Sequence, residues 1–130
     1  MQNFPLTSLS TLVALAVFFW TAILVGKART QFGVEAPAVS GNEQFERRFR
    51  VQMNTLEQLI LLLPTLWLCA AWVGDLYATI GAILWSIGRI VYATTYIKDP
   101  KKRSLGFVLT LVPTLVMGIA VAVTAIKSFI

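Results

Sequence analysis

Residues 6–25 read LTSLSTLVALAVFFWTAILV, a run of 20 residues without a charged side chain. An α-helix rises 1.5 Å per residue, so a run of this length can cross the ~30 Å hydrocarbon core of a bilayer. The cations Lys27 and Arg29 follow the run, whereas a secretory signal peptide carries its positive charge in front of the apolar segment. We therefore predict a retained membrane-spanning helix at about residues 6–27.

The composition of the whole chain is typical of a membrane protein. Hydrophobic residues make up 57% of the 130 residues, charged residues only 13%, and the mean hydropathy is +0.74. Soluble domains contain about 45–50% apolar and about 25% charged residues. The length suits one small domain, so we expect a single integral membrane domain over residues 1–130 and exclude a soluble globular fold.

Three further apolar runs follow the first. Residues 59–73 form a run that is too short to span a bilayer alone, so this helix must begin earlier, among polar residues near 45. Asp99 and Pro100 have the character of an N-cap and a first helical residue. The resulting prediction is an all-α, four-helix membrane bundle whose other helices lie at about 45–73, 76–97 and 100–127.

The chain contains no histidine and one cysteine. Cys/His zinc sites, Ser-His-Asp triads and internal disulfides are therefore excluded, and we expect no metal site. Any chemistry has to come from arginine, lysine, glutamate and tyrosine side chains and from a bound co-substrate.

The net charge of +5 is concentrated in two segments rather than along one face, which argues against a nucleic-acid partner. Residues 27–50 and 98–103 together hold nine of the 11 lysines and arginines. Four spans place both segments on the same side of the membrane, and the positive-inside rule makes that side cytoplasmic. Both termini are then expected to face away from the cytoplasm.

Polar residues at the start of the second predicted helix share one face. The stretch 45–58 reads FERRFRVQMNTLEQ. At 100° per residue, Arg50, Asn54 and Glu57 fall within about 60° of one another. Such a stripe is costly in lipid unless it is paired or wetted, so we expect it to face protein.

A second polar stripe lies on the third predicted helix, where Arg89, Tyr92 and Tyr96 are spaced i, i+3, i+7. The second and third helices are antiparallel neighbours, so the two stripes can face each other near the cytoplasmic ends. Arg103 joins them from the first turn of the fourth helix. Guanidinium groups bind carboxylates in forked pairs, so the cluster suits a small molecule with carboxylates and an ammonium group. Glutathione has this chemistry.

Spacing alone leaves other interpretations open. Arg50 could act only as a positive-inside anchor, and Tyr92 and Tyr96 could be aromatic residues of the membrane interface. Glu57 and Arg89 could form a structural ion pair inside the membrane, with or without a ligand.

The segment ERRFRVQMNTLEQ at 46–58 resembles the E-R-x-x-R-x-x-x-N-x-x-E signature of the MAPEG family, the membrane-associated proteins in eicosanoid and glutathione metabolism. The matching residues are Glu46, Arg47, Arg50, Asn54 and Glu57. Further matching positions extend the resemblance over roughly residues 29–103.

This resemblance implies a homotrimer in which glutathione binds between adjacent subunits near the cytoplasmic side. It implies that Arg103 is the catalytic residue, which favours the thiolate form of glutathione. The residues that it implies for glutathione binding are Arg29, Arg50, Gln52, Asn54, Glu57, Tyr92 and Tyr96. Gln52 points off the stripe, so its contact could serve the neighbouring subunit.

Two positions depart from the pattern of the leukotriene-forming members: Gln58 replaces a tyrosine, and Thr30 replaces a second arginine. We therefore expect a general glutathione transferase of a bacterial inner membrane. It would conjugate glutathione to hydrophobic electrophiles or lipids and could reduce lipid hydroperoxides. The alternatives are a non-catalytic, lipid-binding accessory protein of the same family and a small four-helix transporter.

Overall fold

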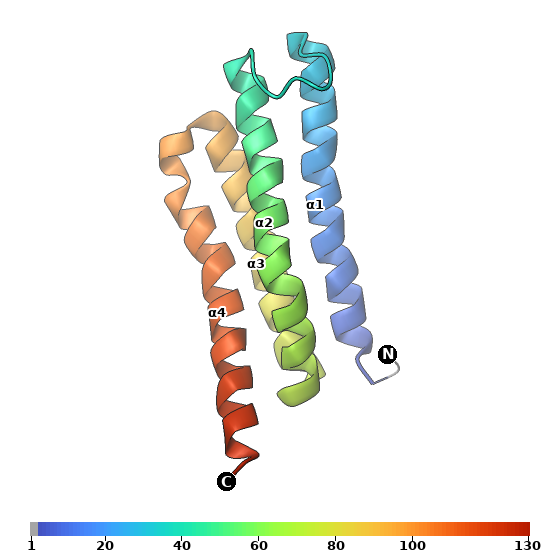
Figure 1. Cartoon of the computed structure of the whole chain (residues 1–130), viewed down its shortest axis with the longest axis vertical. Coiled ribbons are helices and arrows are strands. Elements are labelled where there is room, and N and C mark those ends of the chain that lie inside the picture. Colours follow the sequence, from blue (N-terminus) through green and yellow to red (C-terminus); the bar gives the residue numbers. More distant parts are fainter. Residues whose placement is uncertain (1–2) are drawn as a thin grey trace.

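A computed structural model describes residues 3–130 of the chain. Over these residues it consists of four long α-helices and one short 3₁₀ turn, which lies between the last two helices (Figure 1). In chain order they are α1 (Pro5–Phe32), α2 (Glu43–Trp72), α3 (Asp75–Lys98), η1 (Pro100–Lys102) and α4 (Ser104–Lys127). All four are apolar and long enough to cross a membrane, which confirms the predicted all-α, four-span fold.

Two helix ends differ from the prediction. The helix α1 runs past residue 27 to Phe32 and stops at Gly33, whose φ of 68° is left-handed and lets the amide of Val34 bond back to the carbonyl of Arg29 at 3.0 Å. The fourth helix begins later than expected, because Asp99 and Pro100 start a separate 3₁₀ turn.

Because α4 begins at Ser104, Arg103 has a different position relative to the helix from the one predicted. The carboxylate of Asp99 accepts a bond from the amide of Lys101 at 3.0 Å and caps the turn, whereas the carbonyl of Asp99 accepts the 3₁₀ bond from the amide of Lys102 at 3.0 Å. The carbonyl of Arg103 then accepts the first α-helical bond, from the amide of Phe107 at 3.0 Å. Arg103 is therefore the N-cap residue of α4 and does not lie in its first turn as predicted.

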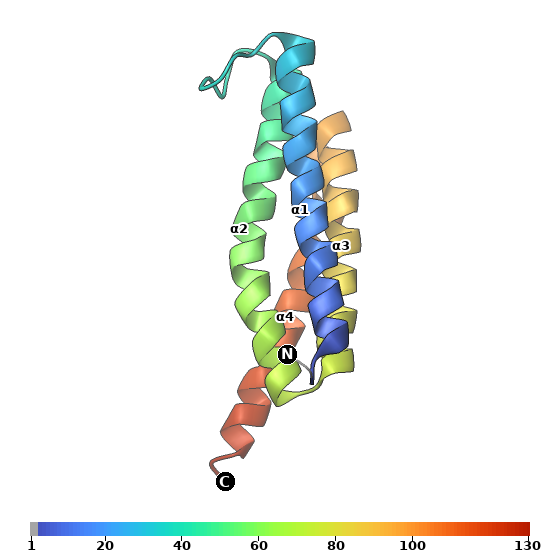
Figure 2. The same ribbon diagram turned by 90° about the vertical axis from the view of Figure 1, so that its right-hand side faces the viewer.

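The helices α1 and α4 lie on different sides of the pair formed by α2 and α3. Helix α1 packs on both α2 and α3, and α4 packs mainly on α3 (Figure 2). Figure 1 shows the start of α1 and the end of α4 at one end of the bundle, and the loop at residues 33–42 and η1 at the other. We call these two the basic connections because they lie within the segments 27–50 and 98–103, which hold most of the lysines and arginines. This arrangement agrees with an even number of spans.

The end of the bundle that holds the termini is fixed by one carboxylate. Asp75, the first residue of α3, accepts hydrogen bonds from the amides of Leu6 and Thr7 at 3.1 and 2.7 Å and from the hydroxyl of Thr7 at 2.6 Å. These are amides that the first turn of a helix leaves without intrahelical partners. Asp75 thus caps α1 from the neighbouring helix.

The crossing of α3 and α4 is unusually close and depends on glycine. A Cβ atom added at Gly106 of α4 would fall on the backbone of Tyr92, and one added at Gly88 of α3 would lie 2.8 Å from the backbone of Leu109. Neither position has space for a side chain. The close approach brings the start of α4 against the tyrosine stripe of α3.

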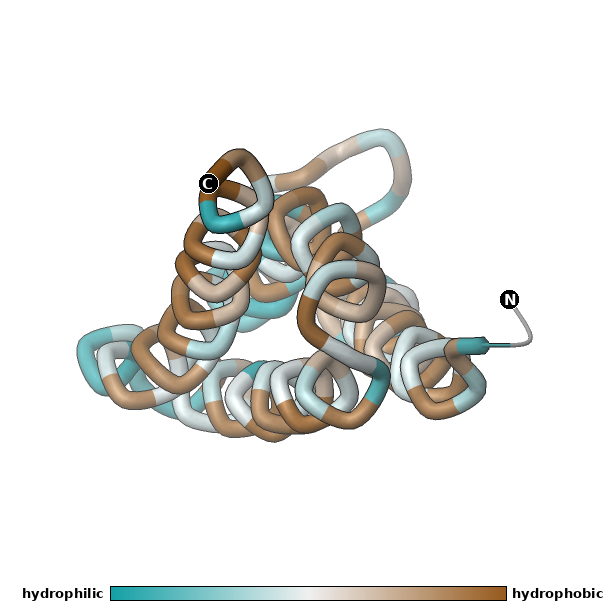
Figure 3. Tube along the Cα trace, turned by 90° about the horizontal axis from the view of Figure 1, so that it is seen from below, coloured by the Kyte–Doolittle hydropathy of each residue, from teal (hydrophilic) through white to brown (hydrophobic). Residues whose placement is uncertain are grey.

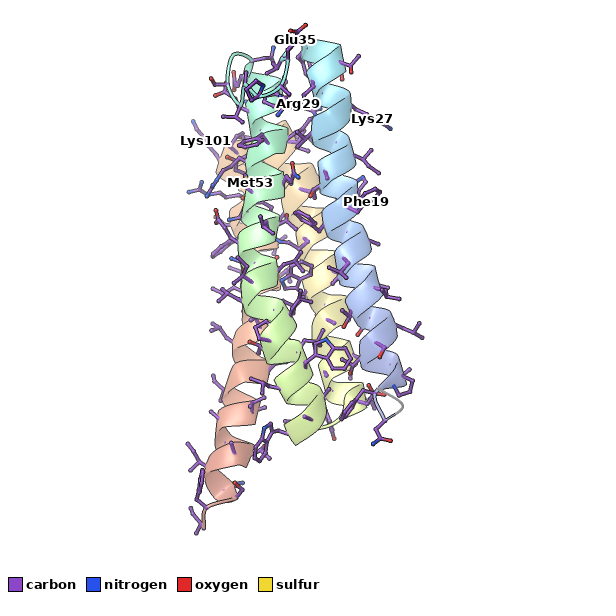
Figure 4. All side chains as sticks on the ribbon, turned by 45° about the vertical axis from the view of Figure 1, so that its right-hand side comes forward. Phe19, Lys27, Arg29, Glu35, Met53 and Lys101 are labelled. Atoms are coloured by element: carbon purple, nitrogen blue, oxygen red, sulfur yellow. The ribbon has the colours of Figure 1, made fainter. Side chains whose placement is uncertain are left out.

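Apolar side chains cover both the inside and the outside of the bundle. Leu62 and Trp85 are fully buried, whereas Phe19, Ile60 and Ile119 are each more than 60% exposed. Figure 3 shows brown, hydrophobic residues along all four helices, and Figure 4 shows Phe19 pointing away from the bundle. An apolar exterior of this extent is typical of a surface that contacts lipid.

Candidate functional site

The two predicted polar stripes meet in a cleft of about 480 Å³ between α2, α3 and α4. The cleft lies toward the end of the bundle that holds the two basic connections. It is lined by Arg50, Asn54, Tyr92, Tyr96, Arg103, Ser104, Phe107 and Val108. We refer to this lined space as the cleft.

Five of the residues predicted from the sequence line the cleft together: Arg50, Asn54, Tyr92, Tyr96 and Arg103. The helical spacing within α2 and α3 was sufficient to find four of them, because the two helices are antiparallel neighbours. Residues of α4 were missed. The hydroxyl of Ser104 and the apolar side chains of Phe107 and Val108 follow Arg103 on the same helix, and their position next to Arg103 is the signal that could have identified them.

Three other predicted residues lie outside the cleft. Arg29 donates hydrogen bonds to the carbonyls of Ala38 and Val34, at 2.7 and 3.4 Å, and so fastens the loop between α1 and α2 (Figure 4). Gln52 is half-buried on α2 and is not part of the lining. Glu57 stands beside the cleft, where its carboxylate accepts a bond from Arg50 at 3.4 Å.

The structure does not form the Glu57–Arg89 ion pair that the sequence left open. Arg89 is fully buried between the helices, whereas the side chain of Glu57 is 55% exposed and lies against Arg50. Helical spacing did not reveal this difference in burial, because Glu57 lies on the outward-facing edge of the polar stripe of α2. Arg89 instead donates hydrogen bonds to neutral oxygens, those of Asn54 at 2.7 Å and Thr110 at 2.9 Å.

The tyrosines form one wall of the cleft. The rings of Tyr92 and Tyr96 stack with centroids 5.5 Å apart and planes inclined by 26°. Behind them, the guanidinium of Arg89 lies 4.1 Å from the centroid of the Tyr92 ring, within the range of a cation–π contact. The Tyr92 ring is therefore in contact with both the Tyr96 ring and the Arg89 guanidinium.

The cleft is strongly basic. Arg50 and Arg103 line it, Arg89 lies directly behind Asn54 and Tyr92, and the only carboxylate paired with any of the three arginines in residues 3–130 is that of Glu57. These groups leave a net charge of +2 around the cleft. The amino-terminal end of α4 adds unpaired backbone N–H groups and the positive end of the helix dipole. Together they favour a ligand with a net negative charge.

Comparison with known protein families identifies the fold. A model of the MAPEG family matches residues 7–123, a range that covers α2 and α3 entirely and most of α1 and α4. The chain belongs to the MAPEG family. This confirms the resemblance drawn from the signature at 46–58, and the MAPEG fold is a membrane helical bundle, as found here.

Several individual MAPEG relatives are similar over much of their length. An uncharacterized protein of Synechocystis sp. is 46% identical over 78% of this chain and 74% of its own. Microsomal glutathione S-transferase 2 from Homo sapiens is 39% identical over 69% of this chain and 61% of its own, and the protein of that name from Bos taurus is 34% identical over 96% and 85%. Leukotriene C4 synthase from Mus musculus is 31% identical over 72% and 62%.

Proposed function

We propose that this MAPEG protein is a membrane-bound glutathione transferase, which activates glutathione as its thiolate for conjugation to hydrophobic electrophiles. The observation that carries the proposal is the basic cleft in which Arg50, Asn54, Tyr92, Tyr96 and Arg103 come together. The similarity to microsomal glutathione S-transferase 2 and leukotriene C4 synthase supports it.

Charge and hydrogen-bonding capacity match glutathione well. With its thiol ionised, glutathione carries two carboxylates, one thiolate and one ammonium group, a net charge of −2 that balances the +2 of the cleft. Arginine side chains only donate hydrogen bonds and hold carboxylates in forked pairs. Arg50 and Asn54 are placed to hold such oxygens, and Glu57 beside Arg50 can accept from the ammonium.

Arg103 is the residue we assign to thiolate activation. It lines the cleft at the N-cap of α4, where its guanidinium and the end of the helix dipole both favour a negative charge. Lowering a thiol pKa from about 8.5 to about 6.5 takes roughly 3 kcal/mol, which one close cation in a partly dry site can supply. The thiol proton passes to water, and the sulfur is left ionised.

The conjugation step follows from that ionisation. The thiolate sulfur forms a bond to an electrophilic carbon, and the leaving group, for example a halide, departs with the bonding electron pair. Phe107 and Val108 form the apolar part of the cleft, and Val108 is exposed on the outer, lipid-facing surface of α4. The second substrate is therefore a hydrophobic molecule that reaches the sulfur from the bilayer.

We extend the proposal to the arrangement of the protein in the membrane. Both basic connections lie at the cleft end, so the positive-inside rule places the cleft on the cytoplasmic side. Arg50 and Glu57 are about half exposed on a membrane-spanning helix, where uncovered charges are costly. A homotrimer that covers this face of α2 would remove the cost, and the roles predicted for Gln52 and Arg29 would then depend on a neighbouring subunit, since neither residue lines the cleft of its own chain.

The test uses detergent-purified protein, glutathione and an aryl halide. The proposal predicts saturable glutathione binding, a thiolate absorbance near neutral pH and release of halide that depends on protein. Binding without halide release, and without reduction of a lipid hydroperoxide, would instead favour the accessory, lipid-binding role. No binding at all would refute the proposal.

A further inference from the structure

Arg89 is a buried charge without a counter-ion. Its side chain is 0% exposed, and no carboxylate among residues 3–130 lies within ion-pairing distance of it. Burying a guanidinium among neutral partners is costly in a membrane bundle. The contacts of this guanidinium show what the buried charge does for the cleft.

The first contact fixes the orientation of an amide. The Nη1 atom of Arg89 donates a hydrogen bond to the Oδ1 atom of Asn54 at 2.7 Å. A guanidinium has no acceptor, so the oxygen of the amide must face Arg89 and the NH₂ group must face the other way. Asn54 lines the cleft, and its two N–H donors are therefore left for a ligand there.

The second and third contacts hold Arg89 itself in place. The guanidinium lies 4.1 Å from the ring centroid of Tyr92, which is another lining residue. On the far side, its Nε atom donates to the hydroxyl of Thr110 on α4 at 2.9 Å. These contacts fix Arg89 between α2 and α4. Two of its partners, Asn54 and Tyr92, line the cleft.

We propose that Arg89 is a positioning residue for glutathione binding, which holds the oxygen of Asn54 from behind and so presents only N–H donors to the cleft. The inference rests on the proposed glutathione site and deepens it, because it assigns the chemistry accepted at Asn54. That position takes a carboxylate or carbonyl oxygen of glutathione and rejects its ammonium group. Arg89 touches no substrate atom in this account.

The test compares Arg89→Lys with Thr110→Val, each purified in detergent. Lysine keeps the positive charge but not the planar fork that reaches Asn54 and Thr110 together. We expect Arg89→Lys to raise the Kd and KM for glutathione about tenfold or more and to change kcat at saturating glutathione by less than about threefold. Thr110→Val removes the hydroxyl that accepts from Arg89 on the side away from Asn54 and that donates to the carbonyl of Gly106, but it leaves the bond from Arg89 to Asn54 in place. It should therefore lower the Tm and leave the glutathione Kd within about twofold.

A double-mutant cycle isolates the route through Asn54. Asn54→Ala alone should weaken glutathione binding, and adding Arg89→Lys to it should weaken binding by less than about threefold more. Additive effects would mean that Arg89 acts on binding by another route and would overturn the inference. Equal glutathione affinity in Arg89→Lys and the unmodified protein would overturn it as well.

Asn54→Asp keeps the inference testable if Arg89→Lys does not fold. An aspartate would pair with Arg89, so the Tm should stay well above that of Asn54→Ala. The loss of the N–H donors, together with the added negative charge against the carboxylates of glutathione, should abolish binding. A Tm no higher than that of Asn54→Ala would show that Arg89 does not hold this side chain and would refute the inference. Failure of the unmodified protein to bind glutathione would instead refute the proposed function, and the inference with it.

Discussion

Gly106→Ala is the substitution whose effect can be worked out most directly from the structure. The added Cβ would lie 2.7 Å from the Cβ of Tyr92 and closer still to the backbone of that residue. Ordinary carbon contacts are about 3.5–4.0 Å, so α3 and α4 would have to separate by roughly 1 Å. Alanine in place of a helical glycine gains about 1 kcal/mol of helix propensity, whereas overpacking typically costs about 1–3 kcal/mol.

The net effect of Gly106→Ala should be a loss of up to about 2 kcal/mol of stability and a displaced cleft wall. Gly118→Ala is the matched control, because Gly118 lies on the same helix and the nearest atom to its added Cβ is 3.8 Å away, an ordinary contact. Thermal unfolding in detergent and titration with glutathione would measure both effects. If Gly106→Ala unfolds and binds glutathione as Gly118→Ala does, the close crossing of α3 and α4 does not shape the cleft.

Three further changes test separate parts of the molecule. Arg103→Gln should still bind glutathione but lose the thiolate absorbance, and its rate at pH 7 should fall about twentyfold or more, as expected if the thiol pKa returns to about 8.5; an unchanged absorbance would remove Arg103 from this role. Asp75→Asn should lower the Tm and leave the glutathione Kd unchanged, because it loosens the cap of α1 at the opposite end of the bundle. Arg29→Ala should make the loop at 33–42 more sensitive to protease, since Arg29 holds the carbonyl of Ala38; equal cleavage would contradict that contact.

Helical periodicity accounts for the part of the site that could be predicted from the sequence. Arg50 and Asn54 recur on one face of α2, Tyr92 and Tyr96 on one face of α3, and the tight turn at Gly74 makes the two helices antiparallel neighbours. These facts suffice to bring the four side chains together. The composition likewise predicted the membrane fold, because few charges and long apolar runs leave no soluble alternative.

The remaining features depend on three-dimensional packing that periodicity does not encode. Glu57 on α2 and Arg89 on α3 carry opposite charges and lie on the two predicted polar stripes. They do not pair, because Arg89 is fully buried whereas Glu57 is about half exposed. Thr110 was not singled out, because a threonine in an apolar run gives no signal until Arg89 is found beside it. The 3₁₀ turn at η1 could not be told from a first α-helical turn, because Asp99 and Pro100 are an N-cap and a first residue that suit either helix.

The most direct test of the account is a titration of the purified protein with glutathione at neutral pH, in which heat and thiolate absorbance are followed together. We expect saturable binding that is accompanied by ionisation of the thiol, with the ionisation lost in Arg103→Gln and the binding lost in Asn54→Asp. Saturable binding without any thiolate signal, or no heat of binding at any glutathione concentration, would contradict the claim that the basic cleft holds and activates this thiol.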